Sequence, residues 1–436
     1  MELRFQDWFT NILGVQSVAQ FGAKQVRPED VLPSSDVDCS PYLKVLPASF
    51  SHPSVVFAKD NLAVIPDDFT GGSIISSWLN SRSGADVFTT CISQMKQASF
   101  IALHDDFLSF IGQAAFMEMA TSFSGIDAEH VHEAPIYIPG TNELIFADTS
   151  VVGWLWTINV ETHERRQIVT KPYLNNVNGG TLHDSRLYFT TNGGPARAIY
   201  NCSLPSDPDP ETGVITSTCE PVLNNYRLAH LNSPNDLIFT SVSNILFTDP
   251  PYGWAQSWPG IEAPELPSAL YHFDTVTRAL VTLDHSILHP NGLALSSDEK
   301  TLYVADSNST SGKPISVWDD SVRNVYAFDW DESRLLLSNK RLVHVVERGW
   351  PDGLRITQAR DGKELLLAAG MGGVDVVDVS RGGAGVLLGK FNVGDDVIFN
   401  LEPVSGKSAR AGKTKDKGVW LLTGRKGVYK VTIAAG

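Results

Sequence analysis

The amino-acid sequence predicts an all-β fold, a six-bladed β-propeller with an irregular N-terminal extension. The first observation is a pattern that recurs six times after about residue 130: a polar residue beside Pro or Gly opens a short apolar strand, and a turn leads to a second strand rich in Leu, Tyr, Phe and Val. The second is the period of about 43 to 61 residues, which is typical of propeller blades and not of helical solenoids. The third is that few segments of this region have the 3.6-residue period of a helix.

The polar residue at the start of each repeat, which we call the opener, defines the blades. The openers in chain order are Glu133, Asn178, Asn235, Asn291, Asp352 and either Asp395 or Asp396. Third and fourth strands are visible as well, since residues 269–274 and 325–329 have the alternation of half-buried strands. Six repeats in roughly three hundred residues therefore predict six four-stranded blades.

The residues before the repeats form a second region. We expect residues 1–100 to be an extension or cap that partly closes the ring, and residues 101–436 to be the propeller domain. Residues 54–58 and 100–103 have strand composition, whereas residues 107–123 indicate a helix. Residues 1–26 fit an amphipathic helix, a loose tail or a signal peptide.

The amino-acid composition excludes some classes of binding partner. The formal net charge of -15 argues against nucleic acid and against anionic membrane surfaces, and no apolar run has the length of a transmembrane helix. We expect a cytoplasmic protein that acts on a small molecule, with secretion as the alternative.

The four cysteines contain no CxxC pair, and Cys202 and Cys219 flank a loop that they can bridge in an oxidising compartment. The oligomeric state stays open.

The openers also predict a metal site. The innermost strand of each propeller blade starts near the central channel, so the openers should point into one volume on the axis. All of them are carboxylate or amide oxygen donors, which favours calcium over zinc. The competing interpretation is that Asn and Asp beside Pro or Gly are ordinary turn residues. Glu133 counts most against it, because Glu is not a preferred turn former.

Other residues near the openers have weaker signals. Asp148, Asp249 and Asp306 end their strands, so we expect them to be structural caps. Candidate substrate-binding residues are Asn178, His132, His230, Tyr252 and Trp350. For the histidines and aromatic residues, simple packing is the competing interpretation. The sequence contains no GxSxG, HExxH or P-loop motif, which leaves the openers as the main candidates for chemistry.

These motifs together resemble the gluconolactonase and regucalcin-like (senescence-marker-protein-type) family of calcium-dependent lactonases, most closely its fungal lactonohydrolases. The resemblance covers about residue 100 to the end. It depends on the segments 132–134, 178–180, 232–236 with 247–253, 290–292 with 303–306, and 351–353.

The resemblance implies that Glu133, Asn235, Asn291 and Asp352 hold the metal, which is Ca²⁺ or else Mg²⁺, Mn²⁺ or Zn²⁺. It also implies a metal-dependent lactonohydrolase that opens a lactone by water attack, with Asp352 and Asn235 as the catalytic residues. Two alternatives remain. One is a biosynthetic enzyme that uses the same site for isomerisation, cyclisation or rearrangement of a secondary metabolite. The other is a non-catalytic propeller with a structural ion. The identity of the lactone stays open.

Overall fold

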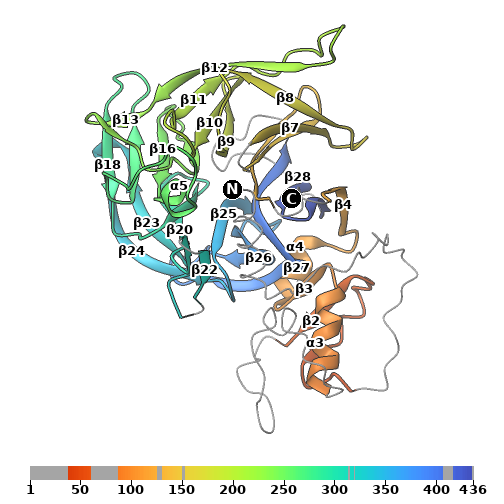
Figure 1. The fold of residues 1–436 in the computed structure, drawn as a ribbon. Coiled ribbons are helices and arrows are strands. Elements are labelled where there is room, and N and C mark those ends of the chain that lie inside the picture. The colour runs from red at the N-terminus through yellow and green to blue at the C-terminus, as the bar shows by residue number, and fades with distance from the viewer. Residues whose placement is uncertain are drawn as a thin grey trace.

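A computed structural model describes residues 38–59, 87–124, 130–149, 153–312, 315–318, 320–405 and 416–434. The segment 1–26, for which we considered a helix, a tail or a signal peptide, lies outside the described residues. The described chain is mostly β-strand, and its sheets stand around a central axis in a propeller-like arrangement (Figure 1). The predicted all-β class is therefore confirmed.

The first four repeats each form four antiparallel strands, and the hairpin of β21 (Thr310–Gly312) and β22 (Ile315–Val317) interrupts only the fourth. The first contains β5 (His132–Ile138), β6 (Glu143–Asp148), β7 (Trp154–Asn159) and β8 (Arg165–Lys171), and the second contains β9 (Val177–His183), β10 (Arg186–Thr191), β11 (Ile199–Cys202) and β12 (Ile215–Leu223). The third contains β15 (Leu237–Phe239), β16 (Ile245–Asp249), β17 (Ala269–Phe273) and β18 (Leu280–Asp284), and the fourth contains β19 (Pro290–Leu295), β20 (Thr301–Asp306), β23 (Asn324–Asp331) and β24 (Leu336–Val345). Parallel pairing of β8 with β12 joins the first two.

The last two repeats share one long strand. Their strands are β25 (Pro351–Gln358), β26 (Glu364–Asp378), β27 (Val386–Ser405), β28 (Asp416–Gly424) and β29 (Gly427–Thr432). Residues 386–397 of β27 pair with β26, and residues 398–405 pair with β28. Because no turn separates the two halves, β27 runs from one sheet into the next (Figure 1).

The N-terminal region adds strands to both of these sheets. It contains β1 (Leu43–Lys44), β2 (Val55–Ala58), α3 (Val87–Gln97), β3 (Phe100–Ala102), α4 (Asp105–Ile111) and β4 (Phe116–Ser122). β3 pairs with β27 and continues into β2 and β1, whereas β4 pairs with β29. The ring is thus closed by β4. The helix predicted over residues 107–123 is wrong in its second half, because residues 116–122 are held by strand pairing.

Apolar side chains of the strands form clusters between neighbouring sheets, which is the expected result of alternating burial. Short elements occupy the loops: β13 (Asn225–Tyr226), β14 (Ala229–His230), α5 (Tyr252–Ala255), β21 (Thr310–Gly312), β22 (Ile315–Val317) and η2 (Glu332–Arg334). Disulfides join Cys202 to Cys219, as the sequence allowed, and Cys39 to Cys91. Within the described residues no helix is both long and apolar enough to span a membrane.

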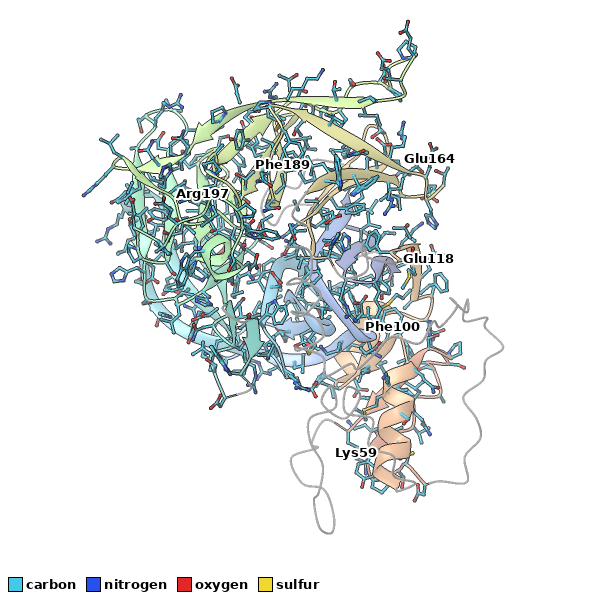
Figure 2. The ribbon with its side chains drawn as sticks, viewed as in Figure 1. Lys59, Phe100, Glu118, Glu164, Phe189 and Arg197 are labelled. Carbon is cyan, nitrogen blue, oxygen red and sulfur yellow. A yellow bond between two sulfur atoms is a disulfide. The ribbon has the colours of Figure 1, made fainter. Side chains whose placement is uncertain are left out.

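Figure 2 adds the side chains to this view. Phe100 and Phe189, both fully buried, represent the packed interior, whereas Glu118 lies on the outer strand β4 and Glu164 lies directly before β8. The apolar interior lies between the sheets, so the polar residues near the axis need a separate explanation.

Candidate active site

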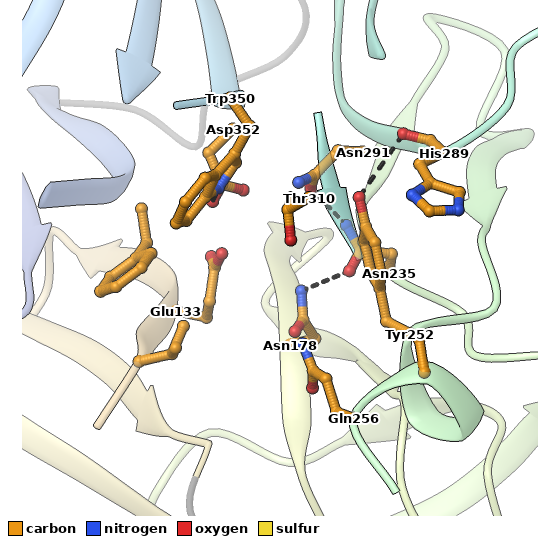
Figure 3. Close-up of a pocket in the computed structure, with 13 residues that line it drawn as sticks. Glu133, Asn178, Asn235, Tyr252, Gln256, His289, Asn291, Thr310, Trp350 and Asp352 are labelled. Atoms are coloured by element: carbon orange, nitrogen blue, oxygen red, sulfur yellow. Dashed lines mark hydrogen bonds between the residues drawn. The ribbon is translucent and has the colours of Figure 1, made fainter. Parts of the chain in front are cut away.

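Five of the six predicted openers meet in one cavity. Glu133, Asn178, Asn235, Asn291 and Asp352 all line it (Figure 3). They come from five different repeats, separated by long stretches of sequence, so only the ring arrangement brings them together. The remaining lining residues are Val131, Tyr252, Ala255, Gln256, His289, Thr310, Trp350 and Phe399.

Local backbone irregularity aims the openers into the cavity. The pairing register shifts between Glu133 and Ile136, between Pro290 and Leu293, and between Pro351 and Leu354. A bulge leaves a residue outside the regular ladder and redirects its side chain. The Pro and Gly residues beside the openers are therefore part of the site's construction.

The strand-end aspartates hold the loops that carry two of the openers. The Asp249 carboxylate accepts backbone hydrogen bonds from Asn232 at 2.8 Å and from Ser233 at 2.7 Å. Asp306 likewise accepts the backbone N–H of His289 at 3.1 Å. These contacts confirm the predicted role of Asp249 and Asp306 as structural caps, and they fix the backbone just before Asn235 and Asn291.

The three asparagine openers form a chain of amide hydrogen bonds. Asn178 Nδ2 donates to Asn235 Oδ1 at 2.8 Å, and Asn235 Nδ2 donates to Asn291 Oδ1 at 2.6 Å. Asn291 Nδ2 in turn donates to Ser307 Oγ at 3.1 Å. An amide oxygen has two lone pairs, so Asn235 and Asn291 can each accept one of these bonds and still offer oxygen to a ligand.

The two carboxylates of the site are buried without a cationic partner. Glu133 is 3% exposed and Asp352 is 5% exposed. Asn400 Nδ2 donates to Glu133 Oε2 at 3.1 Å, and Trp350 Nε1 donates to Asp352 Oδ2 at 2.9 Å. None of the ion pairs between described residues includes either carboxylate. Both are therefore held by neutral hydrogen-bond donors.

Burial raises the pKa values of both carboxyl groups, because no cationic side chain among the described residues offsets it. Burial raises the pKa of Asp352 to about 7. Burial, and then the nearby charge of Asp352, raises the pKa of Glu133 well above its usual range. A strongly perturbed pair of acids in a cavity is typical of a functional site.

The donor set fits a hard divalent cation. Two buried carboxylates need about two positive charges, and the amide oxygens of Asn235 and Asn291 line the same cavity. Among the described residues, no three His, Cys, Asp or Glu side chains gather as a metal cluster. A cation here would depend on amide oxygens as well as carboxylates, which suits calcium better than zinc.

Two of the predicted substrate-binding residues, His132 and His230, lie outside the lining. The buried ring of His132 stacks on Phe123 at a centroid distance of 3.8 Å, and its Nδ1 lies 3.0 Å from Gly424 O. Burial lowers the pKa of His132 to about 4, so it packs as a neutral ring. His230 ends β14 on an exposed hairpin. Asn178, Tyr252 and Trp350 do line the cavity.

The predicted sixth opener is wrong. Lys426 Nζ lies 2.7 Å from Asp395 Oδ1, and the Tyr429 hydroxyl donates to Asp396 at 2.6 Å, so both carboxylates are used in the last sheet. Phe399, farther along β27, lines the cavity in their place.

Sequence reasoning also missed His289, Gln256 and Thr310 as lining residues. His289 directly precedes the Pro290-Asn291 opener, and Gln256 directly follows α5. Their closeness to predicted site residues was the available signal. Thr310 comes from the β21 hairpin, for which the repeat gave no signal.

Comparison with known proteins agrees with this geometry. Residues 131–394 match the model of the SMP-30/gluconolactonase/LRE-like region. The chain belongs to the SMP-30/gluconolactonase/LRE-like family. The resemblance inferred from the motifs is thereby confirmed, and the matched range contains five of the openers.

Relatives in this family include named lactone hydrolases. The chain is 31% identical over 265 residues to lactonohydrolase OryL of Aspergillus oryzae, a match that covers 57% of this chain and 58% of that protein. It is 34% identical over 163 residues to a gluconolactonase of Zymomonas mobilis, covering 35% of this chain and 40% of that protein. The matches therefore span less than two thirds of either relative.

Solved structures support the fold. The gluconolactonase XC5397 of Xanthomonas campestris superimposes with a TM-score of 0.57 at 24% identity, covering 77% of this chain and 95% of that one. At this identity the likeness concerns the fold alone.

Proposed function

We propose that this protein is a lactonohydrolase that opens a lactone ring by water attack and depends on a divalent cation, with calcium as the first choice. The observation that carries the proposal is the buried pair Glu133 and Asp352, which share a cavity with amide oxygens and form no ion pair with any residue that the structure describes. The names of the family's lactone-hydrolysing relatives support the reaction class. We also infer six blades, because the strand pairings divide into six units, the last two sharing β27. Five units have four strands, and β3, β2 and β1 extend the remaining unit to six.

Each proposed cation ligand lines the cavity. They are Glu133, Asn235, Asn291 and Asp352. A cation held there supplies Lewis acidity toward the lactone carbonyl and its developing oxyanion. The chain of amide hydrogen bonds keeps Asn235 and Asn291 in fixed orientations. Asn235, in the middle of this hydrogen-bond chain, contacts the reacting group.

Asp352 is the proposed base. Its Oδ2 is held by the Trp350 indole N–H at 2.9 Å, so the carboxylate has a fixed direction. It accepts the proton of the attacking water and returns a proton to the alkoxide that leaves the opened ring. The chain's own groups thus supply orientation and proton transfer, which typically contributes a factor of about 10²–10⁴ in rate.

A lactone panel tests the proposal. The purified chain, freed of metal by a chelator, is assayed by acid release against lactones of five- and six-membered rings, before and after CaCl₂ is added. We expect ring opening only with the cation, and a product heavier than the substrate by one water. No turnover of any lactone with saturating Ca²⁺ favours the non-catalytic propeller. A product of unchanged mass favours the isomerase alternative.

A further inference from the structure

Three apolar side chains line the cavity beside its two carboxylates: Val131, Trp350 and Phe399. Figure 3 shows Trp350, Asp352 and Glu133 on one side, and the Asn178 and Asn235 amides with Tyr252 on the other. The only hydrogen-bond donor of the Trp350 side chain is directed to Asp352, so the rest of the indole presents carbon to its surroundings. We call Val131, Trp350 and Phe399 the apolar wall.

The three asparagine amides that line the cavity each donate a hydrogen bond to a neighbouring side chain. The Nδ2 groups of Asn178, Asn235 and Asn291 donate to Asn235, Asn291 and Ser307 respectively. Each hydroxyl of a bound polyol loses water and needs a protein partner, or it costs binding free energy. A site with this composition serves an apolar substituent better than a row of hydroxyls.

The apolar wall is supported from behind by residues that precede the family-matched range. One buried cluster contains Val56 and Ala58 of β2, Met95 of α3, and Trp350 and Phe399 of the wall. Val131 packs against the same cluster. The family model begins at residue 131, so β2 and α3 lie outside it. We call residues 38–59 and 87–102 the N-terminal segment.

A disulfide fixes this segment. Cys39, in the turn before β1, is bonded to Cys91 of α3 across 52 residues of sequence. The disulfide links residues 38–59 to residues 87–102, and both parts contribute side chains to the cluster behind the wall. The second disulfide, Cys202–Cys219, joins β11 to β12 and belongs to a different apolar cluster, one without any residue of the wall.

We propose that the site takes lactones with an apolar substituent, and that the N-terminal segment, cross-linked by Cys39–Cys91, supports the wall that binds this substituent. The inference rests on the proposed lactone hydrolysis. It assigns to β2 and α3 a part in substrate selection, although neither contributes a group to the reaction.

The first experiment compares two six-membered lactones, δ-octalactone and glucono-δ-lactone, with the uncatalysed rate subtracted. We expect kcat/KM to be at least about tenfold higher for δ-octalactone, since a few methylenes in an apolar pocket give discrimination of this size. An equal or reversed preference overturns the inference and leaves lactone hydrolysis intact. Turnover of neither lactone counts against the proposed function instead.

The second experiment compares the two disulfides. The Cys39→Ser/Cys91→Ser variant should lose about fivefold or more of the preference for δ-octalactone, mainly through KM, because a looser wall binds the substituent less well. The matched Cys202→Ser/Cys219→Ser variant should keep the preference within about twofold. Melting temperatures are measured for both, so that general destabilisation is seen separately.

A third variant keeps the inference testable if the first does not fold. Val56→Ala shortens a side chain of the cluster behind the wall without touching the cavity lining. We expect the same loss of preference in a smaller amount. An unchanged preference in a folded Cys39→Ser/Cys91→Ser or Val56→Ala protein overturns the role of the N-terminal segment.

Discussion

The buried carboxylates of the cavity differ from the buried carboxylate of Asp375 in the charge of their partners. Glu133 and Asp352 lie in the cavity with neutral partners, and burial raises the pKa of both. Asp375 is as deeply buried, but Lys390 Nζ lies 2.5 Å from its Oδ1 and His344 Nε2 lies 2.8 Å from its Oδ2. Burial alone would raise the pKa of Asp375, and the charge of Lys390 with the His344 hydrogen bond outweighs this effect and lowers it.

The difference shows that the charge of the partner, and not burial alone, decides the direction of the pKa shift. Removing one partner of a compensated pair such as Asp375 and Lys390 is strongly destabilising, because the other charge is left buried and unpaired. An uncompensated pair costs stability, and the chain retains such a pair where another component can complete it. Burial alone does not distinguish the two cases, so the partner of each charge is the informative observation.

The largest expected effect is on catalysis by the carboxylates of the cavity. Asp352→Asn keeps one oxygen donor but cannot accept a proton, so lactone turnover should fall by about 10²–10⁴ at saturating Ca²⁺. The stability of the metal-free protein should not fall, because the variant removes an uncompensated charge. Steady-state kinetics and thermal unfolding in chelator measure the two results. Full recovery of turnover at high Ca²⁺ would show that Asp352 is only a ligand.

The next largest expected effect is on the free energy of unfolding, through the buried pair of Asp375 and Lys390. Asp375→Asn leaves Lys390 buried without its counter-charge and should lower the free energy of unfolding by about 3–5 kcal/mol, with kcat little changed. Denaturant unfolding measures the loss. The control is Asp329→Asn, which breaks the more exposed pair with Arg341 and should cost less than about 1 kcal/mol. Equal losses in the two variants contradict the comparison.

Cation binding should depend on pH. Without the cation, the raised pKa of Asp352 means that its contribution to stability is present below about pH 4 and is lost as pH rises through about 7. The raised pKa of Glu133 acts in the same direction. Added Ca²⁺ should therefore stabilise the fold more at pH 8 than at pH 5. At a hundredfold excess over the Kd at pH 8, the stabilisation at pH 8 should be about 2.7 kcal/mol. Scanning calorimetry at both pH values, with and without chelator, measures the difference. An effect that is equal at both pH values places the cation elsewhere.

The smallest effect concerns Glu133 alone. Glu133→Gln removes one of the two repelling charges while nearly preserving shape, so the metal-free protein at pH 8 should gain on the order of 1 kcal/mol. Calcium affinity, measured by calorimetric titration, should fall steeply in the same variant. Unchanged affinity would make Glu133 a packing residue.

Much of the candidate site was predictable because the repeat sets it. Once the period was recognised, the positions of Glu133 and Asp352 at the starts of inner strands were enough to expect them in one cavity. The prediction for the sixth repeat failed because β27 runs straight through. Asp395 pairs with Lys426, between β28 and β29, and Asp396 accepts a hydrogen bond from Tyr429 of β29. The local sequence does not indicate which strands will pair.

The N-terminal region could not be predicted for the same reason. The pairing of β4 with β29 and the bond between Cys39 and Cys91 depend on contacts far apart in the sequence. The apolar residues of β2 and α3 give no local signal that they support Trp350 and Phe399. Such partners follow from the closed fold and not from the pattern of any one segment.

Closure by β4 also affects how the protein is made. The partner strand β29 follows β4 by roughly three hundred residues, so at about 5–20 residues per second the ribosome releases it some 15 to 60 s later. During that interval β4 presents an unpaired edge, and Phe116 and Met119 remain partly exposed even after pairing. An unpaired strand with apolar side chains readily joins another chain. We therefore expect slowed elongation near the C-terminus to lower the yield of native protein, and chaperones that shield β4 to restore it.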